Sequence, residues 1–441
     1  MNTKVVYPAY RDSGVPWAPR VPDDWQVLRN GRLFAHRVET GFPDLPILEV
    51  SLRTGVRVRD MENLKRKQMM SQKEKYKRAA KGDIAYNMMR MWQGAVGTAP
   101  VDGLVSPAYV VVRPFELVNS TYYSYLFRTD AYMREVNKYS RGIVADRNRL
   151  YWDEFKQMPA LVPPLAEQDQ IVAYLRAQDA RIARLIKAKR ELIGLLTEQK
   201  LRVIDHAVTR GLDASVKLKP SGIEWLGEVP EHWGVKRLKW VCRFAYGDSL
   251  SETSRHGGSV IVYGSNGPVG RHDMANAIGS CIVIGRKGSF GKINYSESDL
   301  FAIDTTYFVD KRCTKENIRW LYYVLIWCRL DKISKDSAIP GLDRRDALDT
   351  FVPVPGVTEQ EKIAEWLDVE TAEINEAISC VEEEIRLIRE YRDRLIFDVV
   401  TGQVDVRGWQ PGPDDVVSDD DLAALNDDEA EPNEEGGDDD A

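Results

Sequence analysis

The sequence predicts an α/β (α+β) chain in which two globular regions are separated by two long antiparallel coiled-coil helices, with an internal pseudo-two-fold repeat. Two long helical periodicities, a repeated opening motif and short strand-like segments in both halves lead to this prediction. The first periodicity follows Pro163-Pro164 and continues without another proline to Gly211, with apolar residues mostly three or four positions apart. Roughly forty helical residues span about 60 Å, and an apolar stripe of that length needs a partner helix.

The partner helix is expected in the same chain, 192 residues later. At this offset Glu167-Gln168 coincides with Glu359-Gln360, and the apolar positions of the two segments fall into register. Two unrelated helices would not share their opening residues, so the match predicts that the helices pack antiparallel within one chain. Thr358 and Glu361 have the spacing of a capping box, so Thr358 is expected to cap the second helix.

A second repeat precedes each globular region. The segment 13–25 aligns with 221–233 at an offset of 208, and Ser, Gly, Trp, Val, Pro and Trp coincide. The two repeats together indicate a duplicated unit in the order globular region, helix, globular region, helix. The expected divisions are a first globular domain at 1–162, a first long helix at 163–212, a second globular domain at 213–355, a second long helix at 356–407 and a disordered acidic tail at 408–441.

Short strands and helices alternate inside both globular regions, which favours an α/β or α+β arrangement. Each copy has an early strand that runs into a GxxG loop with an arginine, Arg90 in the first copy and Arg286 in the second. The segment pairs expected to share a structure are 82–87 with 279–284 (strands), 106–112 with 303–309 (β-rich), 122–127 with 320–327 (aromatic helices) and 140–147 with 337–344.

Charge is divided between the body of the chain and its C-terminal end. The formal net charge is −7, but residues 413–441 contain 14 Asp/Glu and no Lys/Arg. The remainder has 61 basic and 54 acidic residues, a net charge of +7. A tail this acidic and poor in apolar residues is expected to be mobile and dispensable for target choice. The basic body indicates a polyanionic partner, although an ordinary solubilising role explains the tail equally well.

Several functional classes have little support. No apolar run is long enough for a membrane span, and residues 1–22 lack the apolar core of a signal peptide. Five cysteines without CxxC spacing and five scattered histidines predict free thiols, a cytoplasmic location and no metal site. Gly285-x-x-Gly288-x-x-Gly291 has the wrong spacing for a nucleotide-binding loop. The nuclease-like triplet Glu154-Phe155-Lys156 is common by chance, so the chain is expected to bind rather than catalyse.

Basic residues concentrate between positions 53 and 81, where eleven Lys/Arg stand against three Asp/Glu. This density suits a phosphate backbone, although a solvated helix face is an open alternative. Arginines in the glycine loops can bridge guanine O6 and N7, and Asn266 in a polar turn suits adenine or is a turn residue only. The residues expected to contact DNA are Arg57, Lys67, Lys73, Lys75, Lys77, Arg90, Arg141, Arg147, Asn266, Arg286, Lys287, Arg344 and Arg345.

Three motifs carry a resemblance to a known family. They are Pro163-Pro164-Leu165-Ala166-Glu167-Gln168 with its helix to Val208-Thr209-Arg210-Gly211, Gly222-Ile223-Glu224-Trp225-Leu226-Gly227-Glu228-Val229-Pro230-Glu231-His232-Trp233, and Thr358-Glu359-Gln360 with its helix. In this order the chain resembles the DNA-specificity subunit of Type I restriction–modification systems over nearly all of residues 10–407. Residues 15–20 and the tail after Gly408 depart from the family pattern.

The resemblance implies two target-recognition domains, at 1–162 and 213–355, that each read one half of a bipartite double-stranded DNA site. It also implies two methylation subunits docked around the helices and two restriction subunits in the full assembly. No cofactor is expected in this chain, whereas S-adenosylmethionine, ATP and Mg²⁺ are expected in the partner subunits of this restriction endonuclease and adenine methyltransferase complex. The alternatives are a self-contained restriction or methylation enzyme and a coiled-coil scaffold that does not bind DNA.

The helices are expected to act as a ruler for the unread base pairs between the half-sites. Inserting four residues near Lys189 adds about 6 Å of helix and about 40° of rotation, nearly two base pairs of B-DNA. The expected result is a spacer longer by about one or two base pairs with both half-sites unchanged, read by sequencing methylated sites in a cell that carries the native partner subunits. An active variant that kept the original spacer would show that flexible joints set the distance.

Overall fold

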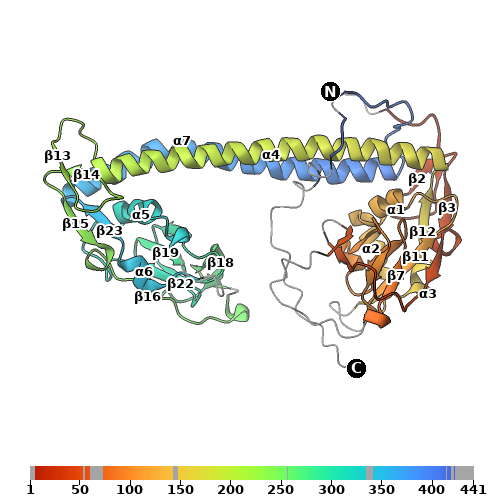
Figure 1. Ribbon diagram of the computed structural model, residues 1–441, viewed down its shortest axis with the longest axis horizontal. Helices are drawn as coiled ribbons and strands as arrows, with labels where there is room; N and C mark the ends of the chain where they lie inside the picture. Colours follow the sequence, from red (N-terminus) through yellow and green to blue (C-terminus); the bar gives the residue numbers. More distant parts are fainter. Residues whose placement is uncertain are drawn as a thin grey trace. The chain divides into compact units, whose positions relative to one another are not determined.

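The computed structural model describes residues 5–52, 55–59, 73–142, 148–255, 257–333, 341–413, 415–418 and 422. The chain divides into two compact units, which we call unit 1 (1–190 with 383–441) and unit 2 (191–382). Helices α4 (Leu165–Arg210) and α7 (Val357–Val400) each run through both units (Figure 1). Each unit therefore contains the beginning of one long helix and the end of the other. The mixed α/β class is confirmed, and the five-part division by residue number stays a prediction.

Unit 1 is built on a four-stranded antiparallel sheet with the order β4-β11-β8-β9. Its central strands are buried on both faces, because Ile84 and Tyr86 point into the main core while Ala85 packs in a second cluster beneath the small β5-β6 hairpin. The bounds are β4 Phe34–Arg37, β11 Tyr109–Pro114, β8 Ile84–Asn87, β9 Val96–Thr98, β1 Tyr10–Asp12, β2 Arg20–Pro22, β3 Gln26–Arg29, β5 Leu48–Ser51, β6 Gly55–Val58, β7 Lys77–Ala79, β10 Gly103–Val105, β12 Pro159–Val162, α1 Ser120–Phe127, α2 Asp130–Tyr139 and α3 Trp152–Phe155.

Unit 2 repeats this plan with the sheet order β16-β22-β19-β20, again antiparallel. Ile282 and Ile284 of its central strand face one apolar core, and Val283 faces another. The bounds are β13 Leu218–Pro220, β14 Glu228–Pro230, β15 Gly234–Arg237, β16 Ala245–Tyr246, β17 Val260–Gly264, β18 Gly267–His272, β19 Cys281–Gly285, β20 Ile293–Ser296, β21 Leu300–Ala302, β22 Thr306–Val309, β23 Phe351–Val354, α5 Ile318–Trp327 and α6 Arg344–Leu348. The predicted early strands, β-rich segments and aromatic helices are thus present in both copies.

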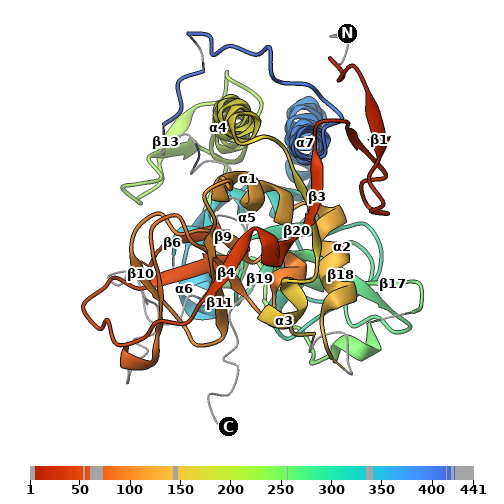
Figure 2. The same cartoon turned by 90° about the vertical axis from the view of Figure 1, so that its right-hand side faces the viewer.

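The two long helices are antiparallel neighbours within each unit (Figure 2). In unit 1 the beginning of α4 and the end of α7 share one core, and Arg392 of α7 donates to both carboxylate oxygens of Asp179 at 2.6 and 3.2 Å. In unit 2 the end of α4 and the beginning of α7 share the other core, and Lys200 donates to Asn375 at 2.7 Å. The antiparallel packing predicted from the matched stripes is therefore confirmed.

The repeated glutamate at each helix start accepts a hydrogen bond from a buried tryptophan of the repeated opening motif. Trp25 Nε1 donates to Glu167 at 3.0 Å in unit 1, and Trp233 Nε1 donates to Glu359 at 3.0 Å in unit 2. Both indole rings are almost fully buried, so each ring needs a partner for its polar N–H group. The opening motif and the helix start, which lie far apart in the chain, are thus joined by the same hydrogen bond in both units.

The repeated glutamine next to this glutamate joins the first turn of its long helix to the beginning of a short helix. Gln168 accepts from the backbone N–H of Asn119 at 2.9 Å, and Gln360 accepts from that of Asn317 at 2.9 Å. Asn119 and Asn317 are themselves the N-caps of α1 and α5. Since these glutamines are fully buried and fully used, the Glu-Gln repeat has a structural role in both units.

The expected cap at Thr358 is wrong. Helix α7 already begins at Val357, and the backbone N–H groups of Glu359 and Gln360 donate to the carbonyl of Gly356 at 2.9 Å. Thr358 therefore lies inside the first turn. The side chain of Gln360 also donates to the carbonyl of Pro355 at 3.0 Å, just before the helix.

The prediction of a free tail from residue 408 is wrong for its first part, which packs along α4 in unit 1. Trp409 lies edge-on against Tyr174 with ring centroids 5.5 Å apart, and its carbonyl accepts from Gln170 at 2.6 Å. Farther on, Arg181 pairs with Asp415 at 2.7 Å. Composition alone missed these contacts because one aromatic ring and one carboxylate are enough to anchor an otherwise polar segment. Residues 419–421 and 423–441 lie outside the described residues.

All five cysteines are free, as the sequence predicts. Burial raises the pKa of the Cys281 and Cys328 thiols to about 12, so both are protonated and unreactive near neutral pH. Among the residues that the structure describes, no helix is long and apolar enough to cross a bilayer.

Candidate nucleic-acid interface

Four of the predicted basic residues come together where β19 ends in unit 2. The carbonyl of Arg286 accepts from the backbone N–H of Leu342 at 2.9 Å, and Lys287 forms a β-bridge with Gly341. Asp343 then caps α6 by accepting from the N–H groups of Arg345 and Asp346. This backbone geometry places the beginning of α6 beside the end of β19. The basic residues carried by these two elements are Arg286, Lys287, Arg344 and Arg345.

Tyr246 at the end of β16 holds the two half-buried arginines. The guanidinium of Arg286 lies 5.2 Å from the centre of its ring and that of Arg344 lies 4.9 Å away. Arg286 also lies 5.8 Å from the ring of Tyr307. Contacts of this kind contribute about 0.5–1 kcal/mol each at exposed sites, and they orient a planar fork without neutralising it. We call Tyr246, Arg286, Lys287, Arg344 and Arg345 the arginine edge.

Within the described part of the chain, the side chains of Arg286 and Arg344 contact carbonyls and aromatic rings. Arg286 donates to the carbonyl of Asp304 at 3.3 Å and Arg344 to that of Phe244 at 3.5 Å, and neither forms an ion pair with a described carboxylate. The nearby carboxylate of Asp343 is occupied as a helix cap. Two guanidinium groups that contact the same tyrosine ring and hydrogen-bond only to carbonyls suit a phosphate oxygen or the O6 and N7 atoms of guanine.

Asn266 reaches the same region, but its side-chain oxygen is engaged. Lys292 donates to the carbonyl of Asn266 at 3.0 Å and to its Oδ1 atom at 2.7 Å. A Cβ atom at Gly285 would lie 3.1 Å from Ser265 O, so the β17-β18 turn is packed directly against the glycine loop. At Gly291, where φ is +75°, a Cβ atom would meet the backbone of Asp331. At these two glycines the chain therefore approaches itself closely.

The basic residues predicted in unit 1 do not form an equivalent cluster. Arg57 pairs with Glu49 at 2.5 Å, and Arg141 pairs with Glu154. Lys73, which is half-buried, and Lys75, which is exposed, lie in a single turn of 3₁₀ helix. Lys67 and Arg147 lie outside the described residues.

Lys77 has a structural role that the sequence did not predict. Its ammonium group donates to the carbonyls of Pro107 at 2.8 Å and Tyr109 at 2.7 Å, at the start of β11. Partial burial lowers the pKa of Lys77 below its ordinary value. The expectation of a free phosphate contact therefore fits Lys73 and Lys75 better than Lys77.

Arg90 and Arg286 are not at corresponding places, although both follow the early strand. In unit 1 the backbone N–H of Leu150, just before α3, donates to the carbonyl of Met88 at 2.8 Å, as that of Leu342 donates to Arg286 in unit 2. Met88 therefore stands where Arg286 stands in unit 2. Arg90 is half-buried and precedes a 3₁₀ turn at Met91–Gln93.

Tyr246, Tyr307 and Lys292 complete the region and were missed by sequence reasoning. Tyr246 lies 40 residues before Arg286, and no local pattern connects the two. A tyrosine at a strand end is ordinarily a packing residue, so only the contact itself identifies its role.

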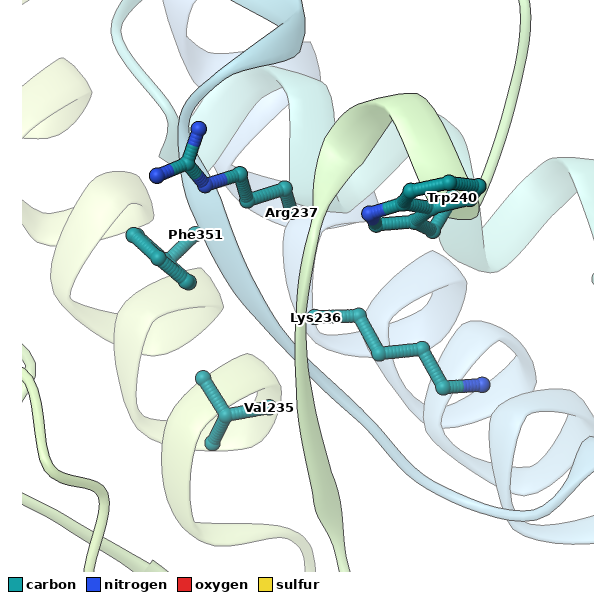
Figure 3. Close-up of a pocket in the computed structure, with 5 residues that line it drawn as sticks. All are labelled: Val235, Lys236, Arg237, Trp240 and Phe351. Carbon is teal, nitrogen blue, oxygen red and sulfur yellow. The ribbon is translucent and has the colours of Figure 1, made fainter.

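A separate surface hollow of about 500 Å³ in unit 2 is lined by Val235, Lys236, Arg237, Trp240 and Phe351 (Figure 3). Arg237 lies over the ring of Phe351 at 5.1 Å and pairs with Asp349 at 3.0 Å. Trp240 is 75% exposed. None of the five lining residues is an acid, a histidine or a nucleophile.

The described residues contain no group of metal-ligating side chains. The nuclease-like triplet is also dispersed: Glu154 pairs with Arg141, Phe155 is buried in the core, and Lys156 pairs with Asp153 at 2.6 Å. The arginines around Tyr246 therefore offer positive charge to an anionic ligand.

Comparison with known proteins gives one family match and a shared fold. Residues 230–383, about a third of the chain, match the family model described as the Type I restriction modification DNA specificity domain. One solved structure comes from work on the complex assembly and conformational transition of the type I R-M system, and it is 16% identical to this chain. The match covers 86% of this chain and 98% of that chain, with a TM-score of 0.56. This likeness shows that the folds are shared.

Two further solved structures are similar over comparable lengths. The HsdS subunit from Thermoanaerobacter tengcongensis is 16% identical and covers 87% of this chain and 98% of its own, with a TM-score of 0.40. The type I restriction–modification S subunit from M. genitalium is 15% identical and covers 86% and 96%, with a TM-score of 0.34. No curated protein sequence matches the chain.

Proposed function

Because residues 230–383 belong to the family of Type I restriction–modification DNA-specificity domains, we propose that this chain is the subunit that reads a bipartite double-stranded DNA site for such a complex. Each globular region, 1–162 and 213–355, reads one half-site. The observation that carries the proposal is the arginine edge, which lies inside the matched region and presents two oriented guanidinium groups without described carboxylate partners.

We propose that the chain itself is a non-catalytic specificity subunit and that the chemistry belongs to its partners. We propose two methylation subunits, which hold S-adenosylmethionine and dock around α4 and α7, and two restriction subunits, which use ATP and Mg²⁺. The similar beginnings of the two long helices support repeated docking. The Glu-Trp and Gln-Asn hydrogen bonds give both units the same frame beside the helices.

The test is to map modified adenines in the genome of a cell that carries this chain and its native partners. Two short sequences at a fixed spacing are expected, and an uninterrupted motif would refute bipartite reading. Methyl transfer by the purified chain alone would favour a self-contained enzyme instead. If the chain with its methylation partners fails to shift any duplex at moderate salt, the coiled-coil scaffold is the better description.

We predict that Lys73→Ala and Lys75→Ala weaken binding to specific and random DNA about equally. Neither side chain is buried, and each lost phosphate contact should lower the slope of log affinity against log salt by about one unit. The measurement is DNA binding between about 50 and 200 mM salt. Lys77→Ala is the matched control, because its ammonium is held by two carbonyls and its loss should leave the slope unchanged.

A selective loss at one half-site after Lys73→Ala or Lys75→Ala would contradict phosphate contact and indicate base reading. A slope that changes as much for Lys77→Ala as for Lys75→Ala would mean that the hydrogen bonds of Lys77 do not persist on DNA.

A further inference from the structure

The two units have chemically different side chains at the same place in the fold. In each, the backbone N–H of a leucine donates to the carbonyl of the residue just past the central strand: Leu150 to Met88 at 2.8 Å, and Leu342 to Arg286 at 2.9 Å. A short helix begins two residues after each leucine, at Trp152 in α3 and at Arg344 in α6. Met88 therefore corresponds to Arg286, and Trp152 to Arg344.

This correspondence replaces the one expected from sequence, which put Arg147 opposite Arg344. The offset between Leu150 and Leu342 is 192 residues, the same as between the long helices. The N-caps Asn119 and Asn317 are still 198 residues apart, so the offset changes between residues 119 and 150 of the first copy.

At these positions unit 1 presents aromatic and apolar groups. His36 at β4 stacks on Trp152, with ring centroids 5.4 Å apart and planes inclined by 17°. Met89 and Tyr151 are exposed beside them in the sequence. We call His36, Met88, Met89, Tyr151 and Trp152 the aromatic edge.

The aromatic edge has little positive charge. Burial and the neighbouring Lys77 ammonium both lower the pKa of His36, so its ring is neutral near pH 7. Three basic groups of unit 1 are occupied: Lys77 by two carbonyls, Arg141 by Glu154, and Lys156 by Asp153. Arg90 and Arg149 lie next to the edge in the sequence but are not part of it. The arginine edge, in contrast, keeps two guanidinium groups without described carboxylate partners.

We infer that the two half-sites differ in the kind of base that anchors them: the arginine edge of unit 2 takes guanine, and the aromatic edge of unit 1 takes thymine through its 5-methyl group. The inference rests on the proposed function. Arginine donates two parallel hydrogen bonds to guanine O6 and N7, whereas an apolar side chain in the major groove contacts the thymine methyl. A neutral stacked His-Trp pair flanked by methionine offers the second contact and cannot offer the first.

The experiment is a chemical interference assay on the complex of this chain with its native methylation subunits, using a duplex that contains the site mapped from modified adenines. One set of duplexes carries guanines methylated at N7, and a second carries uracil in place of individual thymines. N7 methylation is expected to reduce binding about 10- to 100-fold in one half-site only. Uracil is expected to reduce it about fourfold per lost methyl group in the other half-site only.

Variants assign each half-site to a unit. Arg286→Ala should abolish the sensitivity to guanine methylation and leave the sensitivity to uracil unchanged. His36→Ala, an exposed change, and Trp152→Leu should do the reverse. His36→Ala keeps the test decisive if Trp152→Leu weakens folding, because the side chain of His36 is exposed.

Guanine sensitivity in both half-sites, or uracil tolerated at every thymine, would overturn the inference while leaving the proposed function intact. An identical pattern for Arg286→Ala and His36→Ala would also overturn it. Failure of the proposed function is a different result: no duplex, mapped or random, would show sequence-dependent binding in the absence of any modification.

Discussion

Arg286→Ala is expected to weaken binding to the specific DNA site by about 10- to 100-fold, or about 1–3 kcal/mol, with the loss confined to one half-site. The guanidinium is oriented by Tyr246 and Tyr307 and has no described carboxylate partner, so its removal deletes a contact without releasing a buried acid. Random duplex should be bound almost as well as before. The measurement is the affinity of the complex for the mapped site, for the site with each half scrambled, and for random DNA at one fixed salt concentration.

Arg344→Ala should have an effect of the same size, and the double variant should lose less than the sum of the two. The two guanidinium groups share the ring of Tyr246, so each loss alters the setting of the other. Arg271→Ala is the matched control, because this arginine lies in β18 of the same unit and its guanidinium donates to the carbonyl of Ser259. An equal loss on specific and random DNA for Arg286→Ala would reassign this arginine to phosphate contact.

Trp233→Ala should destabilise unit 2 by about 3–5 kcal/mol, the largest effect on stability that we expect from a single substitution. The side chain is 1% exposed, its Nε1 atom donates to Glu359 at 3.0 Å, and a Cβ atom added at Gly211 would lie 3.1 Å from its ring. The substitution removes this packing at the end of α4 and deprives Glu359 of one donor. The measurement is the free energy of unfolding of unit 2 from hydrogen exchange of its most protected amides.

Trp240→Ala is the control for this prediction, since its side chain is 75% exposed in the surface hollow of Figure 3. Its effect on the free energy of unfolding should stay within about 0.5 kcal/mol. Trp233→Phe should fall between the two, because it keeps most of the buried area but loses the hydrogen bond and part of the indole ring. Comparable losses for Trp233→Ala and Trp240→Ala would show that the Trp-Glu contact does not hold the opening motif to the helix.

The long helices and the duplicated plan are determined by the sequence itself. Apolar periodicity is a local property, so it predicts the helices at residues 165–210 and 357–400 independently of the rest of the chain. Matched stripes at a constant offset also imply antiparallel partners. The basic character of residues 286, 287, 344 and 345 was visible in the same way, and the structure brings these four residues together.

Tertiary structure alone decided which residues correspond between the two copies and what each one does. The pairing of Met88 with Arg286 depends on backbone hydrogen bonds that cross 56 to 62 residues of chain, and inserted residues in the loops obscure it in the alignment. Tyr246 contacts two arginines that lie far along the chain. Lys77 donates to a carbonyl of another strand, and Trp409 packs against Tyr174 on α4. These contacts are between groups distant in sequence, and their free energy depends on which surfaces the fold brings together, a property that no local pattern of residue types encodes.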